Sequence, residues 1–245
     1  MKILKTYVEG LDEKLGGGIP EKHIVVVTGN PGTLKSTITY NILYHNAKNE
    51  GVKGAYVSLE QRAEDLTAQM DRLGMKHADV KKDLVMVDVG KVRFVTEDYG
   101  LKKGWIFIVQ DLIKEAKEQV DFSTIVIDSL DVFETMFGGE DPRINLFKFL
   151  EFLKGMNLTC FLIAEMSMDS KEYAKHGIDF LADGIIALSL APVKVQTQMG
   201  FFDDPKERVR SIACVKLRGM NNSTQTYQLV LENNKLKVTD LPVKK

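Results

Sequence analysis

Short apolar runs alternate with helical patterns over the first two thirds of the chain. Runs of mostly apolar residues with the length of buried strands occupy residues 24–27, 55–59, 84–88, 124–128 and 158–164. Between them, apolar residues recur every three or four positions, as on one face of a helix, within residues 38–50, 63–73, 105–120 and 144–156. Strands that alternate with helices form parallel sheets covered on both faces. The pattern therefore predicts an α/β fold with a mostly parallel central sheet.

The final third of the chain has a different pattern. Strand-like runs at residues 184–190, 209–217, 224–231 and 236–238 follow one another with little helix between them. We expect these strands to extend one edge of the sheet in antiparallel order. Residues 89–103, 167–179 and 193–210 are polar and charged, and we interpret them as connecting loops. No repeat or linker interrupts the sequence, which favours a single domain over residues 1–245.

One segment combines a strand, a glycine-bearing turn and a helix. Its residues are Gly29, Asn30, Pro31, Gly32, Thr33, Leu34, Lys35, Ser36 and Thr37. Backbone N–H groups of such a turn, together with the positive end of the helix dipole, form a phosphate site. The pattern G-x-x-x-x-G-K-[ST] assigns Lys35 to the terminal phosphates and Ser36 to Mg²⁺. Leu34 replaces the second glycine, and it is strained if this position needs a glycine-like φ.

Acidic residues follow three of the predicted strands. Glu60, Asp128 and Glu165 stand at carboxyl ends, where open parallel sheets collect ligands. Asp128 matches a carboxylate that holds Mg²⁺ through water or through Ser36, although strand ends are often polar for no such reason. Glu60 is either a base that activates water or an exposed, salt-bridged carboxylate. Glu165 either senses a phosphate through a polar contact or is a solvated strand end.

Two cations lie two residues apart near the end of a later predicted strand. Lys216 and Arg218 therefore project from the same face of that strand. Cations on an exposed strand often only protect the edge of a sheet from aggregation. They also suit the phosphate of a neighbouring subunit, where an arginine stabilises the transition state in trans. Their spacing is compatible with both roles.

The overall composition narrows the class of protein. The formal net charge is −1, from 33 basic and 34 acidic residues, so no global field attracts nucleic acid or an anionic membrane. No apolar run approaches the roughly 18 residues that span a bilayer, and the first residues lack a secretory signal pattern. The two cysteines have no metal-ligand spacing. We expect a cytoplasmic protein without membrane contact. The absence of Asn-Lys-x-Asp favours ATP over GTP.

Taken together, the motifs resemble the KaiC branch of the RecA/RadA superfamily of ATPases, in its single-domain, archaeal-type form. The resemblance covers residues 7–236. It rests on residues 10–20 before the first strand, 29–37 at the Walker A position, 58–61 at a strand that ends in two glutamates, 125–129 at Walker B, and 214–219. It implies a RecA-type P-loop fold that binds ATP and Mg²⁺, and homo-oligomeric rings, often hexamers, with nucleotide between protomers.

The resemblance also implies roles for individual residues. Lys35 would bind phosphate, Ser36 and Asp128 would serve Mg²⁺, and Glu60 would be the general base. Lys216 and Arg218 would act on the neighbour's phosphate. The second glutamate of the family is Gln61 here, which cannot accept a proton at neutral pH and so affects the rate rather than binding.

Three functions follow from these observations. The first is a slow, ring- or filament-forming ATPase. The alternative is a non-hydrolysing, ATP-binding assembly scaffold or regulator, which Leu34 and Gln61 favour. The third is a DNA-recombinase paralogue that contacts DNA through residues 167–179 and 193–210. It is the least supported, because those segments mix charges and lack an aromatic–basic platform. The sequence does not identify a protein client.

Overall fold

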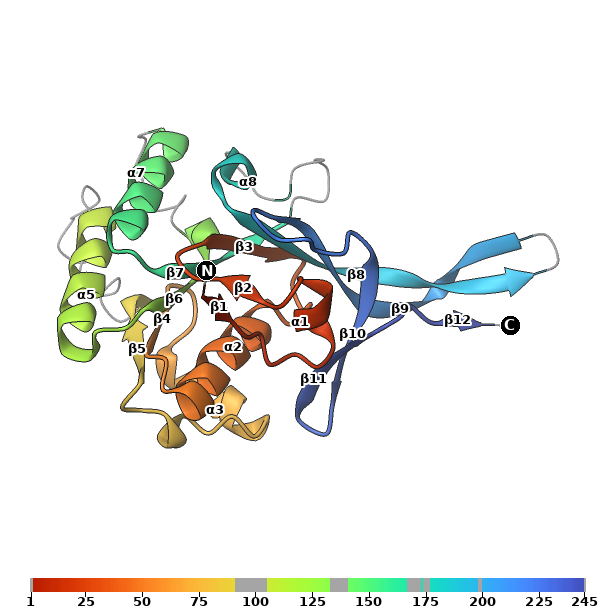
Figure 1. Ribbon diagram of the computed structural model, residues 1–245, viewed down its shortest axis with the longest axis horizontal. Helices are drawn as coiled ribbons and strands as arrows, with labels where there is room; N and C mark the ends of the chain where they lie inside the picture. Colours follow the sequence, from red (N-terminus) through yellow and green to blue (C-terminus); the bar gives the residue numbers. More distant parts are fainter. Residues whose placement is uncertain are drawn as a thin grey trace.

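The computed structural model describes residues 2–90, 105–132, 141–166, 173, 177–197 and 200–244. Its centre is a ten-stranded sheet in which nine strands follow the order β11-β10-β9-β8-β3-β7-β6-β4-β5 (Figure 1). The parallel strands are β3 (Ile24–Gly29), β4 (Gly54–Ser58), β5 (Leu84–Asp88), β6 (Thr124–Asp128), β7 (Thr159–Glu165) and β8 (Gly184–Thr197). The predicted strand–helix alternation and the parallel sheet are confirmed.

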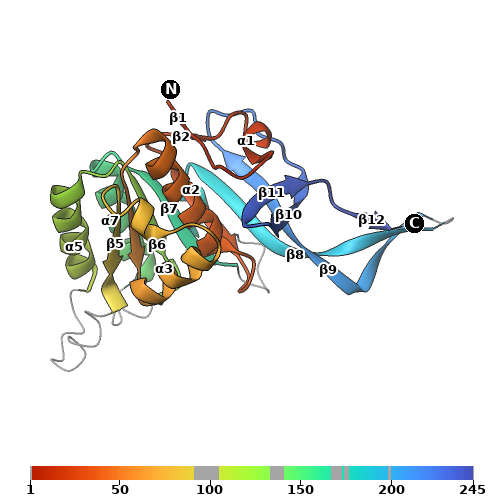
Figure 2. The ribbon, with the colours of Figure 1, turned by 90° about the horizontal axis from the view of Figure 1, so that it is seen from below.

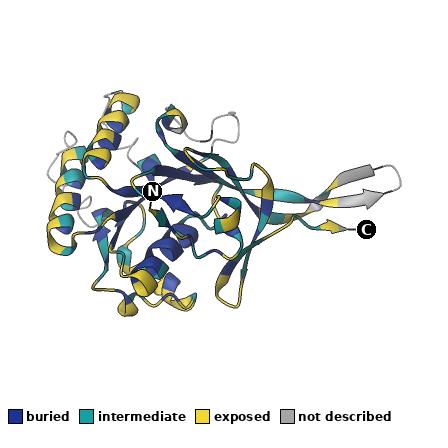
Figure 3. Ribbon diagram, viewed as in Figure 1, coloured by how far each residue is buried: buried dark blue, intermediate teal, exposed yellow. Residues whose placement is uncertain are grey.

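Helices cover both faces of this sheet. One face carries α2 (Lys35–Glu50) and α3 (Ala63–Arg72), and the other carries α5 (Trp105–Val120), α7 (Pro142–Gly155) and α8 (Ile178–Leu181). Alternate residues of one strand enter different cores: Val25 and Val27 pack with α2, whereas Ile24 and Val26 pack with α5 and α7. Figure 3 shows both layers as a buried centre with exposed outer helix faces. The period-two alternation therefore gives the sheet two apolar faces.

Antiparallel strands extend the sheet beyond β8, as the sequence predicts. They are β9 (Gly200–Leu217), β10 (Thr226–Glu232) and β11 (Lys235–Thr239). The distal half of the β8–β9 hairpin extends away from the body of the molecule (Figure 2). β12 (Val243–Lys244) pairs with β8 there.

The prediction that residues 193–210 form a loop is wrong. Residues 193–197 belong to β8, and residues 200–210 belong to β9, in a ladder that runs from Gly184↔Leu217 to Thr197↔Gly200. The Asp203-Asp204-Pro205 sequence has low strand propensity and hides the element, because pairing across the hairpin outweighs local preference. Most of residues 167–179 lie outside the described chain, as do residues 91–104.

Several short elements, most of them at the start of the chain, were not predicted. β1 (Ile3–Leu4) and β2 (Ile19–Pro20) form an antiparallel pair, with α1 (Leu11–Lys14) between them, and η1 (His77–Asp79) follows α3. Glu9 N donates to Leu236 O, and Val238 N donates to Glu9 O, so the N-terminal segment is bonded to β11. This segment closes the α2 face of the molecule. Within the described residues, no helix has the length and apolarity needed to cross a bilayer.

Candidate nucleotide site

The glycine-bearing segment connects β3 to α2. Gly29 ends β3 with φ +156°, and a Cβ atom there would lie 2.3 Å from the Leu188 carbonyl oxygen of β8. Only glycine fits such a close approach of two backbones. The next residues turn the chain so that α2 begins at Lys35. The N-terminus of this 16-residue helix therefore faces the carboxyl edge of the sheet, the arrangement that binds phosphate.

Side chains within the turn bond to its own carbonyl groups. Lys35 Nζ donates to Gly29 O at 2.7 Å and to Asn30 O at 3.2 Å. Thr33 Oγ1 donates to Asn30 O at 2.7 Å, and Thr33 is buried. The Lys35 ammonium thus lies over the turn, within reach of an anion held by it.

Leu34 has the glycine-like conformation that the motif demands. Its φ and ψ are +73° and +26°, in the left-handed region, and it is the residue before the first turn of α2. Its partly buried side chain packs against the core on the α2 face. A left-handed conformation costs an L-residue about 1–2 kcal/mol. Leu34 therefore adds strain to the turn in adopting a backbone conformation that glycine adopts freely.

Asp128 lies beside α2 in a largely apolar setting. Tyr56 OH donates to Asp128 Oδ2 at 2.5 Å. Burial raises the pKa of Asp128, while the Tyr56 and Ser36 hydroxyls and the Lys35 charge partly offset this rise. Burial also raises the pKa of Tyr56 well above its ordinary value, so Tyr56 remains a hydrogen-bond donor. The fold thus brings together Lys35, Ser36 and Asp128.

The donor set at this edge fits Mg²⁺. A buried carboxylate with neighbouring hydroxyls offers the hard oxygen ligands that Mg²⁺ prefers, and this ion typically takes few protein ligands and keeps water and phosphate oxygens. The described residues contain no cluster of three or more His, Cys, Asp or Glu side chains. A metal at Ser36 and Asp128 would therefore be completed by the nucleotide and water rather than by a protein cage.

Glu60 reaches the same edge from the adjacent strand. Ser129 Oγ donates to Glu60 Oε1, and Leu59 N donates to Asp128 O at 2.7 Å. The ends of β4 and β6 are thereby bonded to each other, and the Glu60 carboxylate, which is exposed, is oriented by a hydroxyl. Glu165 is also exposed at the end of β7, where its N–H donates to Asp131 at 2.7 Å.

Lys216 and Arg218 lie at the opposite edge of the sheet. Lys216 Nζ donates to Ala182 O at 2.7 Å, and Arg218 pairs with Asp183 at 3.0 Å. Asp183 in turn bonds to Ile24 at the start of β3. Five residue steps along β3 separate Ile24 from Gly29, a span of about 17 Å. Within one chain, these cations are not beside the glycine-bearing turn.

Sequence reasoning missed two residues that contact this site. Tyr56 reads as an ordinary core position of β4, and nothing in the pattern indicates that its hydroxyl meets Asp128. Arg210 of β9 donates from Nε to Gly32 O at 3.0 Å. Its contact depends on the pairing of β8 with β9, which no local signal predicts.

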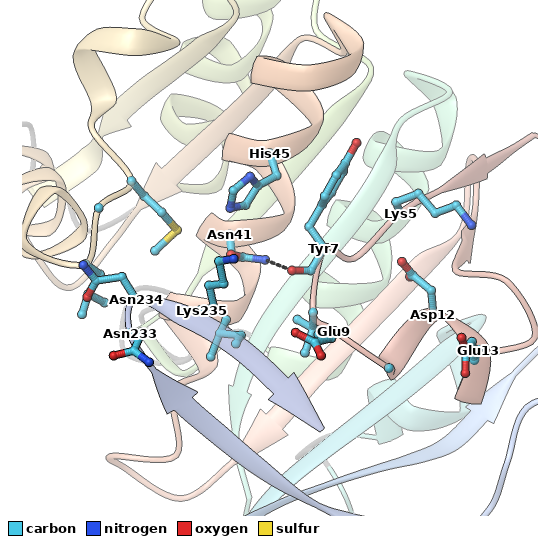
Figure 4. Close-up of a pocket in the computed structure, with 16 residues that line it drawn as sticks. Lys5, Tyr7, Glu9, Asp12, Glu13, Asn41, His45, Asn233, Asn234 and Lys235 are labelled. Carbon is cyan, nitrogen blue, oxygen red and sulfur yellow. Dashed lines mark hydrogen bonds between the residues drawn. The ribbon is translucent and has the colours of Figure 1, made fainter. Parts of the chain in front are cut away.

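A separate cavity of about 680 Å³ lies on the far half of α2 (Figure 4). It is enclosed by the N-terminal segment, α2, the end of α3 and the β10–β11 turn, and none of the residues of the glycine-bearing turn lines it. Tyr7 stacks on His45 there with ring centroids 5.3 Å apart. Burial, helped by the charge of Lys48, lowers the pKa of His45.

The order of the sheet, with a glycine-bearing turn between β3 and α2 and a largely buried aspartate at the end of β6, defines a P-loop protein of the RecA-type class. The family model described as "ATPase: KaiC" matches residues 4–243, and the chain belongs to this family. The resemblance and the RecA-type fold that the motifs predict are confirmed. Membership implies a nucleotide-binding P-loop ATPase domain.

Sequence relatives agree with this assignment, and a solved structure has the same fold. A UPF0273 protein of Aeropyrum pernix is 28% identical over 240 residues, which cover 91% of this chain and 88% of the relative. A UPF0273 protein of Saccharolobus solfataricus is 30% identical over 207 residues, which cover 79% and 71% of the two chains. The crystal structure of a KaiC-like protein from Pyrococcus horikoshii superposes with a TM-score of 0.78 at 24% identity, over 97% of this chain and 99% of that one.

Proposed function

We propose that this protein binds ATP with Mg²⁺ at residues 29–37 and hydrolyses it slowly within a homo-oligomer. The observation that carries the proposal is the convergence of Lys35, Ser36, Asp128 and Glu60 at one edge of the sheet, beside the N-terminus of α2. Lys35 supplies a cation that binds phosphate, Ser36 and Asp128 supply two metal ligands, and Glu60 supplies a carboxylate. Lys35 and Ser36 come from the glycine-bearing turn, whereas Glu60 and Asp128 come from the ends of two other strands.

Binding uses the turn and its lysine. The backbone N–H groups at the start of α2 donate to the phosphate oxygens, and Lys35 exchanges its bonds to Gly29 O and Asn30 O for charge-assisted bonds to the phosphates. Mg²⁺ held by Ser36 and Asp128 would neutralise part of the phosphate charge.

In the hydrolysis step, the Glu60 carboxylate acts on the attacking water molecule. Glu60 orients a water molecule and accepts its proton as the oxygen attacks the γ-phosphorus, and ADP leaves as the bond to the β-phosphate oxygen breaks. The Ser129 hydroxyl holds the carboxylate in place. Gln61 cannot share the proton, which supports a slow rate.

An oligomer is supported by the surface around Arg218. Arg218 donates to Phe180 O at 3.3 Å, and the Phe180 side chain is 73% exposed. Ile144 and Phe147 of α7 are also exposed and line, with Leu181, a small apolar hollow of about 260 Å³. Apolar side chains beside a cation suit a protein interface better than open solvent. We propose that this surface presents Lys216 and Arg218 to a neighbour's ATP.

Two measurements test binding and hydrolysis. ATP–Mg²⁺ at 100 times its Kd stabilises a protein by about 2.7 kcal/mol, so the melting temperature should rise in wild type and not in Lys35→Ala. An unchanged wild-type melting temperature would contradict every nucleotide-based function. Phosphate release should be lost in Glu60→Gln while ATP binding is retained. An equal background in both proteins would favour the alternative, a non-hydrolysing ATP-binding scaffold, which the neutral Gln61 also supports.

The interface has its own test. Light scattering with and without ATP gives the oligomeric state, and a monomer under both conditions would contradict the proposal. Arg218→Ala should reduce turnover, whereas Lys237→Ala on β11 serves as a matched loss of surface charge. Mixing Arg218→Ala with Lys35→Ala should restore part of the activity, because some interfaces then combine an intact Lys35 with an intact Arg218.

A further inference from the structure

The base of the β8–β9 hairpin contacts the phosphate-binding turn at two points. Gly29 lies against the Leu188 carbonyl group of β8, and the Gly32 carbonyl oxygen accepts the bond from Arg210 Nε of β9 at 3.0 Å. Arg210 pairs with Leu190, two residues beyond Leu188, so both contacts arise at the same level of the hairpin. One end and the middle of the turn are therefore attached to one element.

The contact at Gly32 fixes a peptide group that the rest of the turn leaves open. Gly32 has φ +79°, and a Cβ atom there would meet nothing within 4 Å. Glycine has more backbone freedom than any other residue, and no neighbouring atom contacts the side-chain position of Gly32. The following residue is fixed, because Thr33 is buried and bonded to Asn30 O. Burial of Thr33 fixes one side of the Gly32–Thr33 peptide, and the bond from Arg210 fixes the carbonyl group of Gly32 on the other side.

The direction of that peptide matters for phosphate binding. A trans peptide group is planar, so its C=O and N–H point to opposite sides. When Arg210 holds the Gly32 carbonyl oxygen, the Thr33 N–H is turned away from Arg210. Donors fixed in advance bind an anion more tightly than donors that must first be ordered.

We propose that Arg210 is a positioning residue for the nucleotide site of its own chain: it fixes the Gly32–Thr33 peptide so that the Thr33 N–H faces the phosphates. The role rests on the proposed ATP binding and is distinct from that of Arg218, which lies at the opposite edge of the sheet. In this proposal, the part of the β8–β9 hairpin next to the body of the molecule orders the nucleotide site, while its distal half extends from the body (Figure 2).

Three substitutions separate positioning from charge. Arg210→Met keeps the length of the side chain and removes every donor. Arg210→Lys keeps the charge and loses the Nε–H, and Arg208→Met removes an exposed cation two residues away on the same strand. The Kd values for ATP–Mg²⁺ and ADP–Mg²⁺ are measured by calorimetry at low and high salt, and the melting temperature without nucleotide checks the fold.

Loss of one positioning hydrogen bond corresponds to about fivefold weaker binding. We expect this loss for ATP and ADP alike in Arg210→Met, at both salt concentrations, because the bond acts by fixing the geometry of the turn, whereas a long-range attraction between exposed charges would weaken as the salt concentration rises. Arg210→Lys should recover only a small part, and Arg208→Met should bind as wild type does. Wild-type affinity in Arg210→Met, equal weakening in both Met variants, or full rescue by lysine would each overturn the proposal. A wild type that binds no ATP would instead contradict the proposed function itself.

Discussion

Leu34 allows the strain in the phosphate-binding turn to be measured directly. The residue combines a left-handed backbone with a side chain that is partly buried against the α2 core. Leu34→Gly removes both the strain and the packing, whereas Leu34→Ala removes the packing and keeps the strain. The difference between the two variants therefore gives the cost of the left-handed conformation less the extra chain entropy of glycine.

The expected magnitudes follow from these contributions. Release from the left-handed region stabilises the glycine variant by about 1–2 kcal/mol. Against this, the lost half-burial of a leucine costs about 1 kcal/mol, and the extra chain entropy of glycine costs about 0.5–1 kcal/mol. Leu34→Gly should therefore unfold with nearly the wild-type free energy. Leu34→Ala should be less stable than wild type by about 1 kcal/mol, since it loses burial without relief of strain.

Urea denaturation at fixed protein concentration and without nucleotide gives the three free energies of unfolding. In thermal melts, a 1 kcal/mol difference corresponds to about 2–4 °C for a chain of this size. An alanine variant more stable than the glycine variant would refute the argument that Leu34 is strained. We also expect Leu34→Gly to bind ATP–Mg²⁺ at least as tightly as wild type, because it restores the second glycine of the motif.

Three further predictions concern separate parts of the chain. Gly29→Ala should destabilise the protein by roughly 3 kcal/mol or more, because its Cβ would lie 2.3 Å from Leu188 O; wild-type stability in urea would contradict this contact. The lowered pKa values of His45 and His77 mean that the folded state binds fewer protons than the unfolded state, so the free energy of unfolding should fall as the pH drops below 6.5, and His45→Gln should reduce that dependence. Asp128→Asn should leave a folded protein whose ATP-induced rise in melting temperature no longer depends on Mg²⁺; an unchanged Mg²⁺ dependence would exclude the metal role.

The parallel half of the fold was predictable because its strands are buried on both faces. Such strands are continuous apolar runs, as at residues 124–128, and the helices between them follow a separate period. The hairpin was only partly predictable. Its distal half contains Asp203-Asp204-Pro205, and its strand character comes from pairing with β8 rather than from the local sequence. Elements whose conformation depends on a partner distant in the sequence have the weakest local sequence pattern, so they are the hardest to predict.

The same distinction applies to the nucleotide site. The turn at residues 29–37 is local, so its motif predicts its geometry, including the left-handed position that Leu34 occupies. The approach of Ser36, Asp128 and Glu60 follows from a general property of parallel sheets, whose strands end at one edge. The contacts of Tyr56 and Arg210 are predicted neither by the local motif nor by the common edge of parallel strands. They depend on which strands are adjacent and on the direction of each side chain.

The proposed role of Arg218 requires that it exchange one set of partners for another. In the isolated chain, it pairs with Asp183, and its side chain is 54% exposed. An exposed ion pair of this kind contributes about 0–1 kcal/mol, so breaking it opposes assembly only weakly. A bond to a triphosphate in a desolvated interface is charge-assisted and stronger. The balance therefore favours the neighbour's nucleotide over Asp183 once the interface forms, and it predicts that Asp183→Asn leaves assembly intact while Arg218→Ala reduces turnover.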